Sequence, residues 1–126
     1  MPNLHLFFSH RLTDAQKEDA LKSLDVEEFV YLPPDLQQLF SNVPPHLESL
    51  DEYVRPFAQY LLEVARPGDY ILLQGDFGLV YRLVEISKSL GLIPVYATTR
   101  RVALERQEGE KSIKLSAFEH VRFRRY

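Results

Sequence analysis

Short apolar runs alternate with helical patterns along this chain, and that alternation is the feature that most limits its fold. Residues 4–9 form an apolar run that is too short for a buried helix, and a helical pattern follows over residues 13–24. Residues 28–32 are typical of a second strand. Pro33 and Pro34 mark the end of that strand. A strand, a helix and a strand within about thirty residues have the size of a βαβ unit, which favours a parallel sheet.

The rest of the chain continues the alternation. Further elements are expected in the order helix, helix, strand, helix and strand, over residues 34–40, 53–64, 70–73, 79–90 and 93–97. Residues 102–117 then alternate around a polar turn, which predicts an antiparallel hairpin, and residues 121–126 add a strand or bind a partner. We therefore expect a Rossmann-like α/β fold, with a mainly parallel sheet, helices on both faces and a C-terminal antiparallel hairpin. A length of 126 residues fits a single domain over residues 1–126.

Composition limits the classes of function. The chain has no cysteine, which excludes disulfides, thiolate metal sites and cysteine nucleophiles. Its four histidines show no spacing of four residues, and no acidic cluster has ligand spacing, so no metal site is expected. No basic helical stripe or aromatic platform predicts binding of long nucleic acid. Without a secretory signal or an apolar run of about 18 residues, no membrane contact is expected and a cytoplasmic location follows.

Charge is unevenly distributed along the sequence. Residues 100–126 hold eight Lys or Arg and four Asp or Glu, a local balance of +4, whereas the other 99 residues hold seven basic and fourteen acidic groups, a balance of −7. The two balances give the net charge of −3. A basic C-terminal segment on an acidic body suggests an anionic ligand or an acidic partner. A solvated hairpin with additional arginines would explain the same charges.

Polar residues follow the first, third and fourth parallel strands. In an open α/β sheet, ligands bind beyond the carboxyl ends of the strands, where the strand order reverses. Hydroxyl, amide, imidazole and guanidinium groups there, together with backbone N–H groups at helix N-termini, suit a phosphate or a nucleotide. The candidate site residues are Ser9, His10, Arg11, Gln74, Gly75, Asp76, Phe77, Thr98, Thr99, Arg100 and Arg101.

Individual residues at these strand ends have alternative interpretations. His10 could act as a general acid or base, because imidazole titrates near neutral pH, or it could only orient the turn. Arg11, Arg100 and Arg101 could bind phosphate oxygens, although neighbouring residues of a strand point in opposite directions, so only one of the last two would face a ligand. Asp76 could contact a ligand or simply form the N-cap of the following helix.

Four segments of the chain, taken in order, resemble a known family. They are residues 6–13, 31–33, 74–78 and 94–101, and the most specific parts are the Ser-His-Arg-Leu-Thr and Ala-Thr-Thr-Arg-Arg stretches. Together they resemble the small Csx-type accessory proteins of type III CRISPR systems. The similarity extends over nearly the whole chain.

This resemblance implies a CRISPR-associated Rossmann-like fold that binds cyclic oligoadenylates, usually as a homodimer. It further implies a ring nuclease that cuts the cyclic messenger, with cyclic tetra-adenylate as the first expectation, and so ends antiviral signalling. Related enzymes need no metal and no cofactor: the ribose 2′-hydroxyl attacks the neighbouring phosphorus and leaves a 2′,3′-cyclic phosphate. In such an enzyme His10 and Arg11 would be catalytic, and the other candidate residues would bind the ligand.

Two other classes of function remain open at this point. A protein of the same fold could sense or sequester the cyclic messenger without cutting it. Alternatively, the chain could be an interaction protein that docks on another CRISPR component through its basic C-terminal segment.

Overall fold

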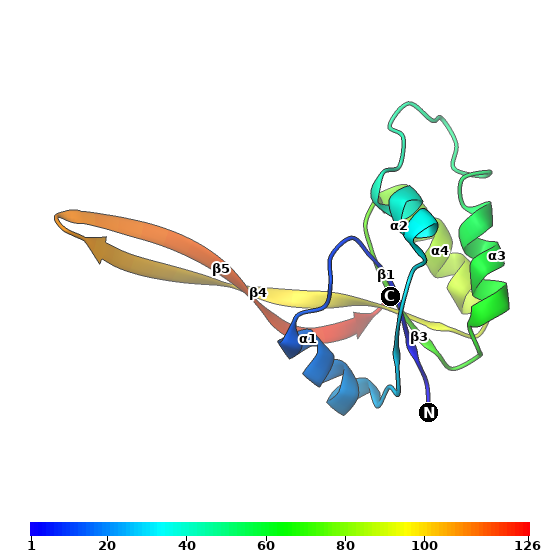
Figure 1. The fold of residues 1–126 in the computed structure, drawn as a ribbon, viewed down its shortest axis with the longest axis horizontal. Helices are drawn as coiled ribbons and strands as arrows, with labels where there is room; N and C mark the ends of the chain where they lie inside the picture. The colour runs from blue at the N-terminus through cyan, green and yellow to red at the C-terminus, as the bar shows by residue number, and fades with distance from the viewer.

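A computed structural model describes all residues, 1–126, and is built around one five-stranded sheet (Figure 1). The strand order is β2-β1-β3-β4-β5. The first four strands of this order run parallel to one another, and β5 pairs antiparallel to β4. This arrangement confirms the expected fold class. The strands are β1 (Leu4–Phe8), β2 (Phe29–Tyr31), β3 (Tyr70–Gln74), β4 (Ile93–Glu108) and β5 (Lys111–Arg125).

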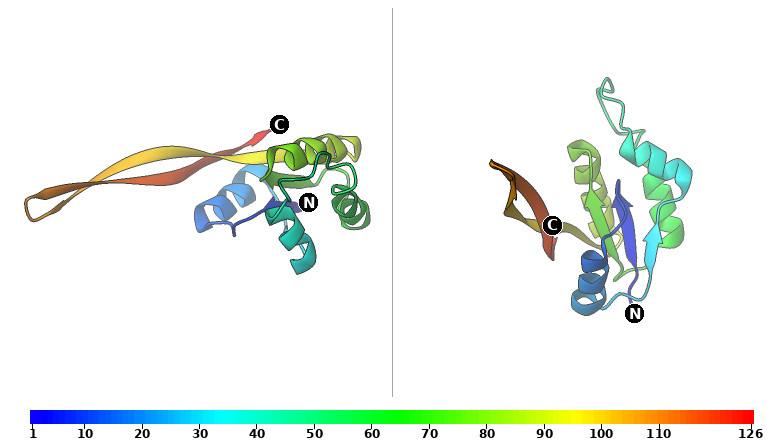
Figure 2. Two further views of the ribbon diagram at one scale, coloured as in Figure 1. Left: turned by 90° about the horizontal axis from the view of Figure 1, so that it is seen from above. Right: turned by 60° about the vertical axis from the view of Figure 1, so that its left-hand side comes forward.

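Helices cover both faces of the sheet (Figure 2). On one face lies α1 (Asp14–Asp19), which continues as a π-helical turn, Ala20–Leu24. On the other face lie α2 (Pro34–Ser41), α3 (Arg55–Val64) and α4 (Phe77–Ser89). None of these helices is both long enough and apolar enough to span a membrane.

Local sequence explains where the helices begin and end. Thr13 and Gln16 form a capping box, in which each side chain accepts a hydrogen bond from the backbone N–H of the other, at 3.2 and 2.9 Å. Pro56 lies in the first turn of α3, where its missing N–H leaves no helical hydrogen bond unmade, and Val54 is the N-cap of that helix. Gly91 follows α4 with a φ of +75°, the left-handed conformation in which glycine commonly ends a helix.

Two apolar cores, one on each face of the sheet, pack the sheet against its helices. Leu4 and Leu6 of β1 face α1 together with Val95 and Phe123, and all four side chains are buried. Phe7 points to the opposite face, where it lies 5.9 Å from the ring of Phe40 in an edge-to-face contact. Because both faces of β1 and β3 are packed, the carboxyl ends of these strands are held by a rigid support.

The largest departure from expectation concerns β4 and β5. Residues 98–101 were expected to follow a strand that ended near Ala97, but β4 continues through them to Glu108. Residue-by-residue pairing with β5 explains the continuation, because residues 95–108 contain no Gly or Pro to interrupt it. The C-terminal tail also belongs to β5 and forms no separate strand.

Beyond the sheet the two strands project as a twisted ribbon, which we call the arm and define as residues 99–120 (Figures 1 and 2). The expected polar turn joins its strands at the tip, where Gly109 has a φ of +62°. The arm leaves the molecule at the edge of the sheet where the parallel strands end. It therefore begins beside the expected site.

Candidate functional site

The carboxyl ends of β1 and β3 lie next to each other at one edge of the sheet. Phe8, the last residue of β1, is paired with Gln74, the last residue of β3. From this edge β1 leads to α1 on one face, and β3 leads to α4 on the opposite face. The strand order therefore reverses between β1 and β3, which is where ligands bind in open α/β sheets.

A groove of about 650 Å³ opens on the α1 face of this edge. His10 and Arg11 line one part of it, and Thr99, Phe118 and His120 line another part at the base of the arm. The His10 side chain is exposed to solvent, and its ring meets the edge of the Phe8 ring at a centroid distance of 5.4 Å. An accessible imidazole and a guanidinium in one groove provide a proton-transfer group beside an anion-binding group.

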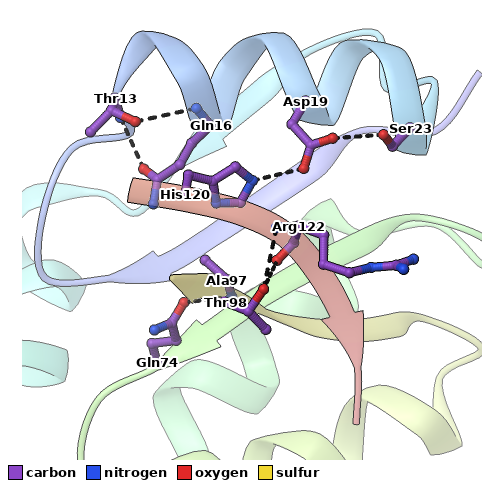
Figure 3. A network of polar contacts seen from close by, with 9 residues as sticks. All are labelled: Thr13, Gln16, Asp19, Ser23, Gln74, Ala97, Thr98, His120 and Arg122. Carbon is purple, nitrogen blue, oxygen red and sulfur yellow. Dashed lines mark hydrogen bonds and ion pairs between the residues drawn. The ribbon is translucent and has the colours of Figure 1, made fainter. Parts of the chain in front are cut away.

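His120 is a further candidate in this groove, and it is held in place by Asp19 of α1 (Figure 3). Its Nε2 lies 2.7 Å from Asp19 Oδ2, and Ser23 Oγ donates to the other carboxylate oxygen at 2.6 Å. Burial by itself raises the pKa of Asp19, but the hydrogen bonds from Ser23 and His120 outweigh it and lower that pKa below its ordinary value. The carboxylate therefore stays ionised and orients the imidazole, as in known acid–base pairs.

A second cavity, of about 490 Å³, lies on the α4 face of the same edge. Its walls are mainly apolar and aromatic, and Phe77 and Tyr81 are 94% and 66% exposed. Gln74 supplies a polar group: its amide oxygen accepts from the backbone N–H of Ala97 at 2.8 Å, which leaves the amide nitrogen to donate (Figure 3). We call this cavity the aromatic pocket; its lining residues are Gln74, Gly75, Phe77, Val80, Tyr81, Val84, Tyr96 and Tyr126.

Two C-terminal residues that sequence reasoning did not single out shape the aromatic pocket. The Tyr126 hydroxyl donates to the backbone oxygen of Leu73, which fixes the chain end against β3. Arg124 lies over the ring of Tyr96, with its guanidinium carbon 5.6 Å from the ring centroid, and donates to the Tyr96 hydroxyl at 3.1 Å. A basic group therefore stands beside an aromatic wall.

The sheet separates the candidate residues into two sets. His10, Arg11 and Thr99 lie in the groove on the α1 face, whereas the residues from Gln74 to Phe77 lie at or beside the aromatic pocket on the α4 face. Ser9 contacts α2, because Ser41 Oγ donates to its hydroxyl at 3.1 Å. The residues therefore share one edge of the sheet, as expected, but they do not form a single cluster.

The candidate residues of β4 have local partners on β5. Thr98 Oγ1 donates to the backbone oxygen of Arg122 at 2.9 Å, beside a β-bulge between Thr98 and Thr99 (Figure 3). Arg100 pairs with Glu119 at 3.2 Å, while Arg101 donates to Ser116 Oγ at 3.0 Å. The two arginines lie on opposite faces of the arm, as strand alternation requires, and only Arg101 shares the face of Thr99.

Asp76 is the N-cap of α4. Its Oδ2 accepts a hydrogen bond from the backbone N–H of Leu79 at 3.0 Å. We predict that Asp76→Ala lowers the free energy of unfolding by about 1 kcal/mol, because the Leu79 N–H loses its partner. Asp76→Ser should keep most of that stability, because serine also caps helices. Urea denaturation of both variants measures the difference. Equal stability of the Ala and Ser variants would contradict the capping role.

Gly75 lies against the core and not in open space. A Cβ added there would come within 2.9 Å of Cε2 and 3.0 Å of Cζ of Phe40, a ring buried in the core. Gly75→Ala is therefore predicted to lower the free energy of unfolding by about 1–3 kcal/mol through overpacking. Gly78→Ala is the matched control, because its Cβ would meet no atom closer than 3.4 Å and alanine favours the helix. Thermal denaturation should show opposite effects, and similar losses would refute the steric explanation.

The histidine and acidic side chains are not arranged as a metal site, since no group of three or more of them lies together. The strand-end surface holds instead imidazole, guanidinium, amide and aromatic groups on two faces of one sheet edge. Such groups recognise the phosphates, sugars and bases of a nucleotide.

Comparison with known proteins gives a family. The model of the Uncharacterized protein MJ1673 family matches residues 2–124. The chain is also 47% identical over 126 residues to Uncharacterized protein MJ1673 of Methanocaldococcus jannaschii, a match that covers 100% of this chain and 98% of the relative. None of the solved structures matches the chain.

Proposed function

This chain belongs to the Uncharacterized protein MJ1673 family, and we propose that it is a ring nuclease that cleaves a cyclic oligoadenylate, with cyclic tetra-adenylate as the expected substrate. The observation that carries the proposal is the groove in which His10, Arg11, Thr99 and His120 meet at the edge where the strand order reverses. The resemblance of the strand-end segments to type III CRISPR accessory proteins supplies the ligand. In the cell such an enzyme works in the cytoplasm and switches off antiviral signalling.

The proposed reaction is a transesterification within the ring. A ribose 2′-hydroxyl attacks the adjacent phosphorus, its proton passes to a base, and the P–O5′ bond breaks as the leaving oxygen gains a proton. The products are a linear oligoadenylate with a 5′-hydroxyl and a 2′,3′-cyclic phosphate. Holding the 2′-hydroxyl in line with the leaving oxygen supplies much of the acceleration, because the entropy lost in orienting the reacting groups is already paid on binding.

The groove provides groups for each requirement of this reaction. The exposed His10 transfers the proton to or from the reacting oxygens. Arg11, whose guanidinium carbon now lies 5.2 Å above the Tyr31 ring centroid, stabilises the charge that develops on the phosphoryl oxygens. His120, fixed by Asp19, is a second imidazole beside the same groove. The His120 side chain is 5% exposed and its Nε2 already contacts Asp19, so it shapes the wall of the groove, and the exposed His10 carries the proton transfer.

The aromatic pocket suits an adenine of the same ligand. A base can stack on an aromatic wall of the pocket, Tyr96 or Tyr126, and the Gln74 amide nitrogen can donate to a ring nitrogen. A cyclic ligand lying across the sheet edge would reach this pocket and the groove together. As in the proteins that the chain resembles, we expect a homodimer to bind the ring on its two-fold axis.

One incubation separates this function from the alternatives. Cyclic tetra-adenylate is mixed with the protein in EDTA, and the products are separated by chromatography. Linear products that end in cyclic phosphates support the enzyme. An intact ring with tight binding indicates a sensor or a sequestering module, and neither binding nor cleavage favours an interaction protein.

A further inference from the structure

The arm leaves an apolar face uncovered. In its register Val102 pairs with Ala117 and Leu104 pairs with Leu115, so these side chains lie on one face together with Ile113. Leu104 and Leu115 are 50% and 43% exposed. The opposite face carries the Glu105–Lys114 pair in its outer part, and Phe118 is exposed on that face near the base of the arm. The outer part of the arm is therefore amphipathic. Beyond its base, where His120 contacts Asp19 of α1, no other element of the chain packs along the arm (Figure 2). We call Val102, Leu104, Ile113, Leu115 and Ala117 the apolar stripe.

The chain exposes more surface than a compact monomer of its size. Its accessible area is 8479 Å². A compact chain of 14.7 kDa is expected to expose about 6,900 Å². The excess of about 1,500 Å² is larger than the roughly 800 Å² that each partner buries in a stable interface of standard size. A two-stranded ribbon without further packing is also only marginally stable in water. Both facts indicate that the arm is covered in the working protein.

Charge favours a protein as the covering partner. Residues 99–120 hold five Lys or Arg and four Asp or Glu, so the arm is close to neutral. A nucleic acid or an anionic membrane would require a clear positive excess. An apolar stripe bordered by charges of both signs is typical instead of a contact between proteins.

The chain itself carries a matching surface. Phe77 and Tyr81 of α4 are exposed, and they lie on the face of the sheet to which Tyr96 points. By strand alternation, Val102 and Leu104 continue the Tyr96 face of β4 into the arm. The arm projects away from its own α4, so one chain cannot bring the two surfaces together (Figure 1). A second copy can do so twice, because a two-fold axis exchanges the arms.

We propose that the arm of each copy docks by its apolar stripe over Phe77 and Tyr81 of a second copy. Both uncovered surfaces of both chains are then buried in one symmetric interface. The arm of the second copy also stands at the mouth of the aromatic pocket, so the pocket is completed only in the dimer. This inference needs no ligand and does not depend on the proposed nuclease chemistry.

Analytical ultracentrifugation of the full chain without ligand tests the proposal. The wild-type protein should sediment as a species of twice 14.7 kDa. Leu104→Glu combined with Leu115→Lys removes the stripe but keeps a favourable cross-strand pair and the net charge. This double variant should dimerise at least about 100-fold more weakly. Its matched control is Glu105→Lys with Lys114→Glu on the opposite face, which should dimerise like the wild type. A monomeric wild type, or a stripe variant that dimerises as tightly as the control, would overturn the proposal.

Cross-linking gives a second measurement that does not require the stripe to be removed. Because the chain has no cysteine, Leu104→Cys and Tyr81→Cys can be prepared as separate proteins and mixed with a short bismaleimide. A cross-linked pair between the two proteins is expected in high yield. Glu105→Cys, on the opposite face of the arm, should give a much lower yield with Tyr81→Cys. Equal yields, or no cross-link, would show that the arm does not lie over α4 of a second copy.

Discussion

Replacing His10 by alanine should slow single-turnover cleavage of cyclic tetra-adenylate by about 100-fold or more, while binding of the ring changes little. A positioned acid or base contributes at least this much to a reaction in which two oxygens exchange protons. The exposed side chain lines the groove and belongs to neither apolar core, so its loss should leave the fold intact. Rapid-quench kinetics with enzyme in excess measure the chemical step, and calorimetry measures the binding.

The matched control for this prediction is His46→Ala. His46 is also exposed, but it lies in the loop between α2 and α3 and lines neither the groove nor the aromatic pocket. This variant should cleave at the wild-type rate. An unchanged rate for His10→Ala would remove His10 from the mechanism.

The second large effect is expected at the opposite edge of the sheet, where replacing Asp69 by alanine should cost about 3 kcal/mol of unfolding free energy. The Asp69 side chain is 8% exposed, and its carboxylate accepts hydrogen bonds from the backbone N–H groups of Asn3 and Arg66, both at 3.0 Å. His5 Nε2 lies 2.8 Å from the same carboxylate. Alanine would leave these buried groups without their partner. Urea denaturation at neutral pH measures the loss, and Glu48→Ala, at an exposed position, should change stability by less than about 0.5 kcal/mol.

Asp69 should also give the protein part of its sensitivity to acid. Burial by itself raises the pKa of Asp69, but hydrogen bonds from His5, Asn3 and Arg66 outweigh it and lower that pKa below the ordinary 3.8. A carboxyl whose folded pKa is lowered stabilises the fold fully above its unfolded pKa, and the contribution is lost as the pH falls through the folded value. The difference in stability between wild type and Asp69→Ala should therefore shrink below about pH 3.8. A difference that is constant through this range would contradict the assignment.

Much of the fold follows from local sequence signals. The capping box at Thr13 and Gln16, the left-handed Gly91 and the apolar runs of β1 and β3 are determined by neighbouring residues, and the structure contains all of them. The arm was not foreseen at its full length, because Thr98 to Arg101 are polar residues typical of a strand end. Their strand conformation depends on pairing with β5, a contact between residues about twenty apart.

The site was predicted less completely than the fold. Strand order explains why His10 and Gln74 share one edge of the sheet, but only the three-dimensional packing shows that they lie on opposite faces. His120 was missed as a candidate because its partner, Asp19, is 101 residues away and no spacing motif joins them. Tyr96, Arg124 and Tyr126 likewise meet at the aromatic pocket only through the pairing of β4 with β5 and the docking of the chain end.

Backbone NMR shows whether the ligand binds at the carboxyl edge of the sheet. The His10→Ala variant, which should bind without rapid turnover, is labelled with ¹⁵N and titrated with cyclic tetra-adenylate. Binding at this edge should give the largest amide shifts in residues 9–11, 74–77 and 98–101. Shifts that concentrate at the opposite edge, around Asn3 and residues 66–69, or no shifts at saturating ligand, would contradict it.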